Sequence, residues 1–422
     1  MIARLRTSLS WMNRDARLIT LARGVRTFSQ SFIAVIMAIY LAELGFNLVQ
    51  IGAVLTVGVA GVSFFALVVG LISERVGRRR LLVLFSLLAA AAGVGMYFAE
   101  AFVPLLIIAF LGSLSTGGGG GESPAQPLEV AILPDTGPPE RRTDIFAVYS
   151  IVARTGTFLG ALAAGMPVLL QDVLGLSLLS SYKAMFLGFA LCQLAGAALY
   201  LFVSSSVEGA ATRQQWQNPF RLPSRRRIFT LITLYSVDTF TTSMVMQSLV
   251  AYWFYTKFGL PVESLALVFS LSHLLTASSL WISAKIANRI GLLNTMVFTH
   301  IPSSFFLLAA AFAPTAPLAI VFWQCRAFLS QMDVPTRDSY NMSVINSEER
   351  VAMASINMVT RSAAGAVGPS VTTAIWNITA AWAPLVGSAL LKIGYDLSLY
   401  FMFRNVRPPE EEERLRNRRQ GR

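Results

Sequence analysis

Charged and polar side chains inside long apolar segments are the residues of this chain that could do chemistry. A charge within a membrane-length helix is costly, so each one is a functional candidate. A buried carboxylate such as Asp238 can carry a proton, and a buried cation such as Arg326 can bind an anionic or polar solute. The alternative for each is a packing role, in which the polar group satisfies a neighbour or reaches the membrane surface. The candidates for solute or proton binding are Arg26, Asp238, Gln247, His273 and Arg326.

One apolar segment, near residues 316–345, holds several of these charges. Asp333 and Arg337 stand four residues apart, so they can pair along one face of a helix. Arg326 precedes Asp333 by seven residues and therefore shares that face. We expect Arg326 to lie higher in the membrane than Asp333, as the best single candidate for a buried cation that binds a solute.

Catalytic and metal-binding patterns are not visible in the sequence. We find no nucleophile–base set, and the two histidines, His273 and His300, have no cysteine or second histidine at ligand spacing. No nucleotide-binding loop is present either. The two cysteines, Cys192 and Cys325, lie in apolar runs and are too few for a disulfide framework. We therefore expect no enzyme activity, no cofactor and no metal.

The composition indicates a membrane protein with many spans. The 422 residues are 55% hydrophobic and only 13% charged, and the mean hydropathy is +0.60. This charged fraction is about half that of a soluble domain. The net charge of +12 would suit a nucleic-acid partner, but the basic residues gather at the termini and in alternate loops. Such a distribution is typical of membrane topology.

Apolar segments long enough to cross a bilayer, roughly 20 residues each, occur twelve times. The sequence thus predicts an all-α membrane protein, with two six-helix bundles at 1–203 and 228–403, a central cytoplasmic loop at 204–227 and a cytoplasmic tail at 404–422. With this count the basic loops share one side, so we expect both termini in the cytoplasm and a location in the cell membrane. The expected helices lie near 18–44, 48–72, 81–100, 103–128, 144–170, 182–203, 228–256, 262–284, 292–313, 316–345, 351–378 and 383–403.

The two halves repeat each other. Arg289-Ile290-Gly291 follows Arg75-Val76-Gly77 by 214 positions, and Gly259 follows Gly45 by the same interval. Two pairs of intramembrane charges also recur. They are Glu122 with Asp333, 211 positions apart, and Arg154 with Arg361, 207 positions apart.

A basic turn between the second and third segments carries the most specific motif. It resembles the loop between helices 2 and 3 of the major facilitator superfamily, whose pattern is G-x-L-x-D-R-x-G-R-R/K. Isoleucine replaces the leucine and glutamate the aspartate, and both keep the chemical type. The chain looks like uncharacterised bacterial or archaeal members of that superfamily. The residues that fill the pattern are Gly70, Ile72, Glu74, Arg75, Gly77, Arg78 and Arg79.

The resemblance implies two pseudo-symmetric bundles with a solute site between them near the midplane. It makes helices 4 and 5 neighbours, as are 10 and 11, so we expect Glu122 near Arg154 and Asp333 near Arg361. These pairs would either hold each bundle together or exchange partners as a gate. Helix 9 is peripheral in this fold, which makes His300 a weaker candidate than His273.

The resemblance also implies roles for the first helix and for the basic turn. Helices 1 and 7 line the central cavity in this fold, so Arg26 and Asp238 could meet across it. The turn would latch the cytoplasmic side: Glu74 would contact the start of helix 11, and Arg75 and Arg78 would pair with Glu129 or Asp135.

The resulting prediction is a secondary active transporter that moves a small organic solute by alternating access. We expect proton coupling, and efflux more than uptake. An uptake symporter or facilitator is the alternative, and a transporter-like sensor or receptor is the alternative from another class. The expected partners are the solute, protons and the lipid bilayer, without nucleic acid, and by resemblance the protein is a monomer.

Overall fold

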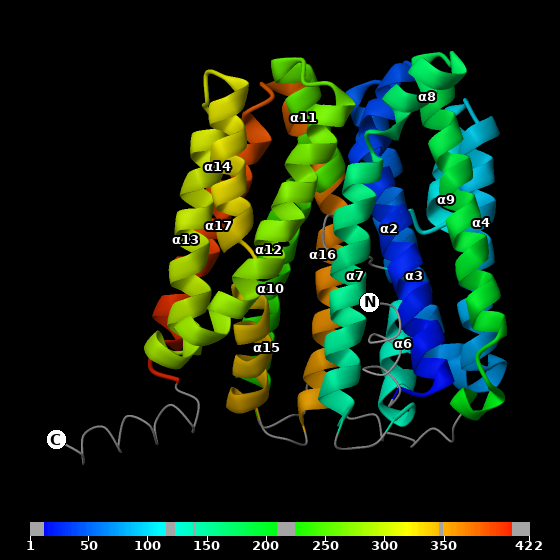
Figure 1. The fold of residues 1–422 in the computed structure, drawn as a ribbon. Helices are drawn as coiled ribbons and strands as arrows, with labels where there is room; N and C mark the ends of the chain where they lie inside the picture. The colour runs from blue at the N-terminus through cyan, green and yellow to red at the C-terminus, as the bar shows by residue number, and fades with distance from the viewer. Residues whose placement is uncertain (1–11, 115–122, 138–140, 209–223, 346–348, 407–422) are drawn as a thin grey trace, which may run out of the picture. The chain divides into compact units, whose positions relative to one another are not determined.

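The structure, a computed structural model, describes residues 12–114, 123–137, 141–208, 224–345 and 349–406. Within these ranges it is built of helices, without strands (Figure 1). The α-helices are α2 (Arg14–Glu43), α3 (Leu48–Val76), α4 (Arg78–Phe98), α5 (Phe102–Leu111), α6 (Gln126–Ile132), α7 (Arg142–Ala163), α8 (Met166–Leu174), α9 (Leu178–Leu201), α10 (Arg225–Met244), α11 (Gln247–Phe258), α12 (Val262–Ile290), α13 (Leu292–Ala311), α14 (Ala316–Leu329), α15 (Asp333–Val344), α16 (Arg350–Ile378) and α17 (Ala383–Phe403), and the short 3₁₀ helices are η1 (Leu133–Asp135) and η3 (Ser205–Glu208).

Helices occupy each of the twelve expected segments, which confirms the all-α membrane fold. In the described part of the chain, nine helical stretches are long and apolar enough to cross a membrane. Four expected helices are each divided into two shorter ones, at α5/α6, α7/α8, α10/α11 and α14/α15. Prolines favour three of these divisions, because Pro127, Pro167 and Pro335 lie in the first turns of α6, α8 and α15, where a backbone N–H has no helical partner.

Side chains at the helix starts explain several boundaries. The Asn13 side chain accepts a hydrogen bond from the Ala16 N–H at 2.7 Å and caps α2. Asn47 and Gln50 cap α3 reciprocally, with the Asn47 side chain accepting from the Gln50 N–H and the Gln50 side chain accepting from the Asn47 N–H. Such caps replace helical hydrogen bonds that the first turn lacks.

The repeat seen in the sequence recurs in the backbone. Gly77 and Gly291 stand at the junctions before α4 and α13, with φ of 99° and 93°. Gly45 and Gly259, the other repeated glycines, also have positive φ. Side chains are unfavourable in this region of φ, so glycine is the residue that these four turns require.

The chain divides by packing into two compact units. Unit 1 comprises 1–213 and 246–270, and unit 2 comprises 214–245 and 271–422. The boundary between α10 and α11 therefore falls inside the expected helix 7. The two packed units thus differ from the two repeated six-helix bundles expected at 1–203 and 228–403. The division into those bundles stays a prediction.

Unit 1 is organised around α2, which packs against α7 and α9. Glycines allow the closest approach: a Cβ added to Gly160 would lie 2.1 Å from the Phe28 carbonyl oxygen. α11 also packs on α2, where the Ser248 hydroxyl donates to the Ala34 carbonyl at 2.7 Å. The hydrophobic core lies between α2, α4, α6, α7 and α9 and includes Ile19, Leu82, Leu128, Ile145 and Tyr200.

Unit 2 is organised in a similar way around α10, which packs against α16 and α17. A Cβ added to Gly368 of α16 would lie 1.8 Å from the Ser243 hydroxyl oxygen, so this contact also needs a glycine. α13 packs against α14, α15 and α17. The core residues include Tyr235, Met296, Tyr340 and Leu399.

Candidate functional site

Unit 1 buries one arginine–carboxylate pair. The Arg26 guanidinium of α2 binds the Glu129 carboxylate of α6 with two hydrogen bonds, Nη2 to Oε2 at 2.6 Å and Nη1 to Oε1 at 2.9 Å. The Tyr149 hydroxyl donates to Oε2 at 2.7 Å, and the Tyr200 hydroxyl donates to Oε1. Glu129 is fully buried, yet both of its oxygens have two donors. The four donors saturate the Glu129 carboxylate, which offsets the cost of burying its charge.

The partner of Glu129 corrects one expectation. We expected Arg75 and Arg78 of the basic turn to pair with Glu129 or Asp135, but Arg26 binds Glu129. The basic turn has another acidic partner, because the Glu208 carboxylate accepts hydrogen bonds from the backbone N–H groups of Arg78 at 2.6 Å and Arg79 at 3.1 Å. A carboxylate at this position caps the start of α4 and is favoured by the helix dipole. Glu208 was overlooked in the sequence as a partner of the basic turn, although this acid follows the last helix of the first half.

The remaining residues of the basic turn lie at the surface. Gly70, Glu74 and Arg75 are exposed near the end of α3. The Arg79 side chain donates to the Leu201 carbonyl at the end of α9. The turn is therefore fastened to its own unit by α9 and η3.

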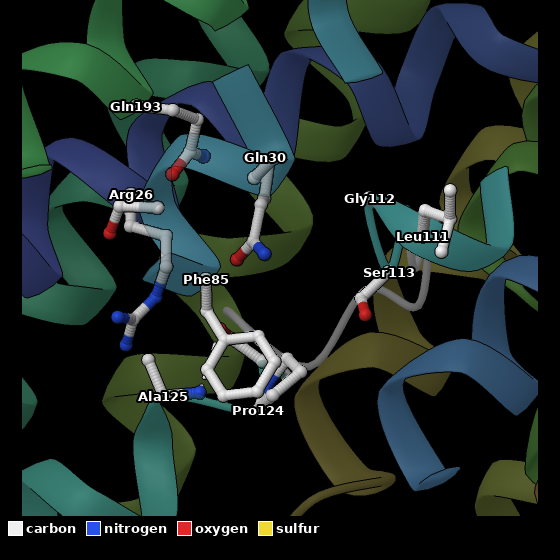
Figure 2. Close-up of a pocket in the computed structure, with 12 residues that line it drawn as sticks. Arg26, Gln30, Phe85, Leu111, Gly112, Ser113, Pro124, Ala125 and Gln193 are labelled. Atoms are coloured by element: carbon white, nitrogen blue, oxygen red, sulfur yellow. Dashed lines mark hydrogen bonds between the residues drawn. The ribbon is translucent and has the colours of Figure 1, made fainter. Parts of the chain in front are cut away.

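A small polar pocket adjoins the Arg26–Glu129 pair (Figure 2). Gln30 and Gln193 reach it from α2 and α9, and Ser86 reaches it from α4. The Gln193 amide donates to the Ser29 hydroxyl at 3.0 Å, which fixes its orientation. The pocket lies inside unit 1, and its wall includes Ser113 and Pro124, on either side of the residues 115–122 that lie outside the described part.

Unit 2 buries a larger set of charges. Arg337 of α15 contacts two carboxylates through Nη1, with Asp333 Oδ2 at 2.8 Å and Asp238 Oδ2 at 3.1 Å. The Lys392 ammonium of α17 lies 3.0 Å from Asp238 Oδ1. The Asp333–Arg337 pair is the one that the four-residue spacing predicted, so that local prediction is confirmed.

His300 of α13 extends this set to α17. Its Nε2 lies 2.9 Å from Asp333 Oδ1 and 3.3 Å from the Ser330 carbonyl oxygen. Its Nδ1 lies 3.2 Å from Asp396 Oδ1. The histidine and both carboxylates are buried. We define the unit 2 cluster as Asp238, His300, Asp333, Arg337, Lys392 and Asp396.

Several predicted partners are arranged differently. Asp333 binds Arg337 and His300, whereas the Nε of Arg361 donates to the Thr239 hydroxyl at 2.7 Å. Arg26 and Asp238 each have ionic partners within their own unit. Glu122 lies outside the described residues, and Arg154 is exposed on α7.

Arg326 of α14 stands apart from both clusters. It is half-buried, and its guanidinium carbon lies 4.6 Å from the centroid of the Trp323 ring. Among the described residues, no carboxylate lies within ion-pair distance of Arg326. The Trp323 indole donates to the Ser272 hydroxyl at 3.1 Å, and Ser272 donates to Gln324 at 3.0 Å. The aromatic surface that holds the cation is thus fixed by α12.

The other two candidates are placed on separate helices. Gln247 is buried at the start of α11 in unit 1, and His273 is half-buried on α12 in unit 2. Our reading of the sequence did not single out Lys392 or Asp396. Their spacing of four residues inside an apolar segment is the signal that could have found them.

Comparisons with known proteins agree with the fold. A family model described as Major Facilitator Superfamily matches residues 19–369. A Saccharomyces cerevisiae protein, Uncharacterized membrane protein YJR124C, is 23% identical over 426 aligned residues, covering 93% of this chain and 95% of the relative.

Solved transporter structures are similar over nearly the whole chain. The nucleoside transporter NupG is 12% identical with a TM-score of 0.72, covering 92% of this chain and 98% of its own. The D-xylose-proton symporter is 12% identical with a TM-score of 0.70, covering 92% of this chain and 97% of its own. The human organic anion transporter MFSD10 is 15% identical with a TM-score of 0.62, covering 92% of this chain and 99% of its own. At these identities the similarity establishes the fold.

Proposed function

Since this chain belongs to the major facilitator superfamily, we propose that it moves a small organic solute across the membrane by alternating access, coupled to protons. Membership in that family makes it a multi-pass membrane transporter of small solutes and not an enzyme. The solute class, the coupling ion and the direction are our proposals. We propose efflux, a cell-membrane location, both termini in the cytoplasm and a monomer.

The observation that carries the proposal for the solute is Arg326. Its half-buried guanidinium stacks on Trp323, and within the described part of the chain its hydrogen-bond donors are left for another group. A cation inside a membrane segment is costly unless a partner compensates it. An anionic or strongly polar solute would supply that compensation. Organic anions are therefore the solute class that Arg326 favours.

The remaining candidates take supporting roles in this proposal. Gln247 and His273 would contact the polar parts of the solute, and Asp238 would take part in proton coupling. Arg154 and Arg361 lie at less buried positions than Arg26, which suits groups that change partners as the transporter opens. Glu122, in the proposed gate, lies outside the described residues.

Transport by purified protein in proteoliposomes tests the solute and the coupling together. The probes are labelled organic anions, nucleosides, sugars and peptides, each assayed with and without an imposed pH gradient. We expect movement of the organic anions, faster with the gradient. Binding without movement would favour the sensor alternative and contradict the proposal, as would movement that no gradient affects.

Arg326→Ala tests the cation directly. We expect its loss to raise the solute concentration for half-maximal transport by about ten- to a hundredfold, because a hydrogen bond to a charged group is worth about 1.5–3 kcal/mol. Arg404→Ala is the matched control, because Arg404 also stacks on an aromatic ring, that of Phe401, but is exposed at the end of α17. Equal transport by the Arg326→Ala variant and the wild type would show that this cation does not bind the solute.

The proposed topology has a separate test. Cysteine tags at Arg78 and Arg225 should both react with a membrane-impermeant reagent from the cytoplasmic side only. Labelling of the two positions from opposite sides would contradict the twelve-span arrangement.

A further inference from the structure

We propose that His300 and Asp396 form a proton-binding site inside unit 2, and that the proton bound there is the one coupled to transport. This inference rests on the proposed proton-coupled function and assigns the proton to a pair of residues. It places the bound proton on a pair from α13 and α17, in the same cluster as Asp238, which itself contacts two cations.

Both ring nitrogens of His300 face oxygen acceptors. Nε2 faces two acceptors, Asp333 Oδ1 at 2.9 Å and the Ser330 carbonyl oxygen at 3.3 Å, so Nε2 must carry a hydrogen. Nδ1 faces Asp396 Oδ1 at 3.2 Å. A neutral imidazole has only one N–H, which Nε2 already uses. A second hydrogen is therefore needed between Nδ1 and Oδ1, on either His300 or Asp396.

Asp396 is the place where that hydrogen can be gained and lost. Its residue is 0% exposed, and its Oδ2 has no hydrogen-bond partner among the described residues. A buried carboxylate with one contact is far less well compensated than Glu129, which has four donor contacts. The proton shared with His300 supplies the missing compensation. Because the two groups are in contact, it belongs to the pair.

The net charge of the surrounding groups favours binding of one proton at this site. Three carboxylates of the unit 2 cluster, Asp238, Asp333 and Asp396, contact two permanent cations and His300. One added proton makes the cluster neutral. The groups around it are the hydroxyls of Tyr235 on α10 and Tyr395 on α17, and Arg361 of α16, which donates to Thr239.

The site is also connected to the proposed solute cation. His300 contacts both sides of the break between α14 and α15, through the Ser330 carbonyl and the Asp333 carboxylate. The Ser330 N–H in turn donates to the Arg326 carbonyl at 2.9 Å. A change in the charge of His300 alters its attraction to both groups at the break. We infer that the proton and the solute are coupled through the α14–α15 break.

Infrared difference spectroscopy between acid and alkaline pH tests the site on purified protein in lipid, without any solute. We expect a titration step in the imidazole and carboxylic acid bands that both Asp396→Asn and His300→Gln abolish. Asp172→Asn is the control, because Asp172 is an exposed carboxylate at the end of α8. Persistence of the step in both variants would overturn the site. Thermal unfolding curves confirm that each variant is folded, and the two variants give independent tests.

Transport distinguishes failure of the site from failure of the proposed function. With the organic-anion probes, the variants should keep solute exchange at equal pH but lose gradient-driven accumulation by about tenfold, the range expected for coupled sites. Driven accumulation that equals the wild type in both variants would overturn the coupling role. If the wild type itself shows no response to the gradient, the proposed proton coupling fails, and the spectroscopic result still decides whether the proton site exists.

Discussion

Unit 1 and unit 2 both bury arginine–carboxylate contacts, but they compensate their charges differently. In unit 1, Arg26 and Glu129 form a one-to-one pair completed by two tyrosine hydroxyls. In unit 2, the cluster has three carboxylates, and the geometry around His300 requires one additional proton. The first arrangement is suited to holding helices together. The second is suited to gaining and losing a proton.

The comparison predicts that breaking the unit 1 pair has the largest effect on stability. Arg26→Met leaves Glu129 buried without its cation, which should lower the free energy of unfolding by about 3–5 kcal/mol. Denaturant unfolding in lipid–detergent micelles measures this change. The double variant Arg26→Met/Glu129→Leu is the control, and it should recover most of the loss because no buried charge remains. A double variant as unstable as the single one would contradict a paired structural role.

A smaller effect is expected in unit 2, because its charges share partners. Lys392→Met removes one of two cations from Asp238 and leaves Arg337 in place. We expect a loss of about 1.5–3 kcal/mol in the free energy of unfolding. The same unfolding measurement applies, with Lys392→Met/Asp238→Asn as the matched control. A loss as large as that of Arg26→Met would show that Arg337 does not compensate the charge of Asp238 when Lys392 is removed.

One tyrosine in each unit allows the two units to be compared through a single hydrogen bond. Tyr149→Phe removes a donor to the charged Glu129, whereas Tyr235→Phe removes a donor to the neutral Asn341 side chain. Charged acceptors make stronger bonds, so we expect losses of about 2 kcal/mol and about 1 kcal/mol respectively. Thermal unfolding of the two variants side by side gives the difference. The reverse order would mean that Arg26 alone satisfies Glu129.

The smallest effect is expected where an ion pair is exposed. The Lys183 ammonium lies 2.5 Å from Glu100 Oε1, outside the buried clusters. The hydrogen bond from Lys183, followed by its charge, lowers the pKa of Glu100. The pair therefore contributes stability above the usual pKa of glutamate, and this contribution is lost as pH falls through the lowered value. Lys183→Ala should remove that acid-dependent step from unfolding midpoints measured against pH, and added salt should weaken it in the wild type. Midpoints that do not change would show that solvent screens the pair completely.

Local patterns in the sequence predicted local features of the structure well. The twelve helical segments followed from hydropathy, and the Asp333–Arg337 pair followed from spacing along one helix. The breaks at α7/α8, α10/α11 and α14/α15 were not predicted, because an apolar run looks continuous whether or not its backbone is interrupted. Pro167 and Pro335 carried part of that signal.

Contacts between distant segments were predicted less well. Glu129 was one of two acids predicted to pair with the basic turn, but its partner is Arg26, 103 positions away. His300 was ranked below His273, although His300 lies between two buried carboxylates. Neither contact leaves a trace in spacing, because the two partners lie on different helices whose rotation about their axes is set by packing.

The sequence by itself determined the class of protein, the helical segments and the duplicated turns, since hydropathy, charge in loops and glycine at positive φ act on each segment separately. Only the tertiary structure decided which buried charges compensate one another. The physical reason is that a charge in a membrane helix must find a partner, but any opposite charge on a neighbouring face would serve. Packing between helices, such as the glycine contacts of α2 with α7 and of α10 with α16, selects which faces meet.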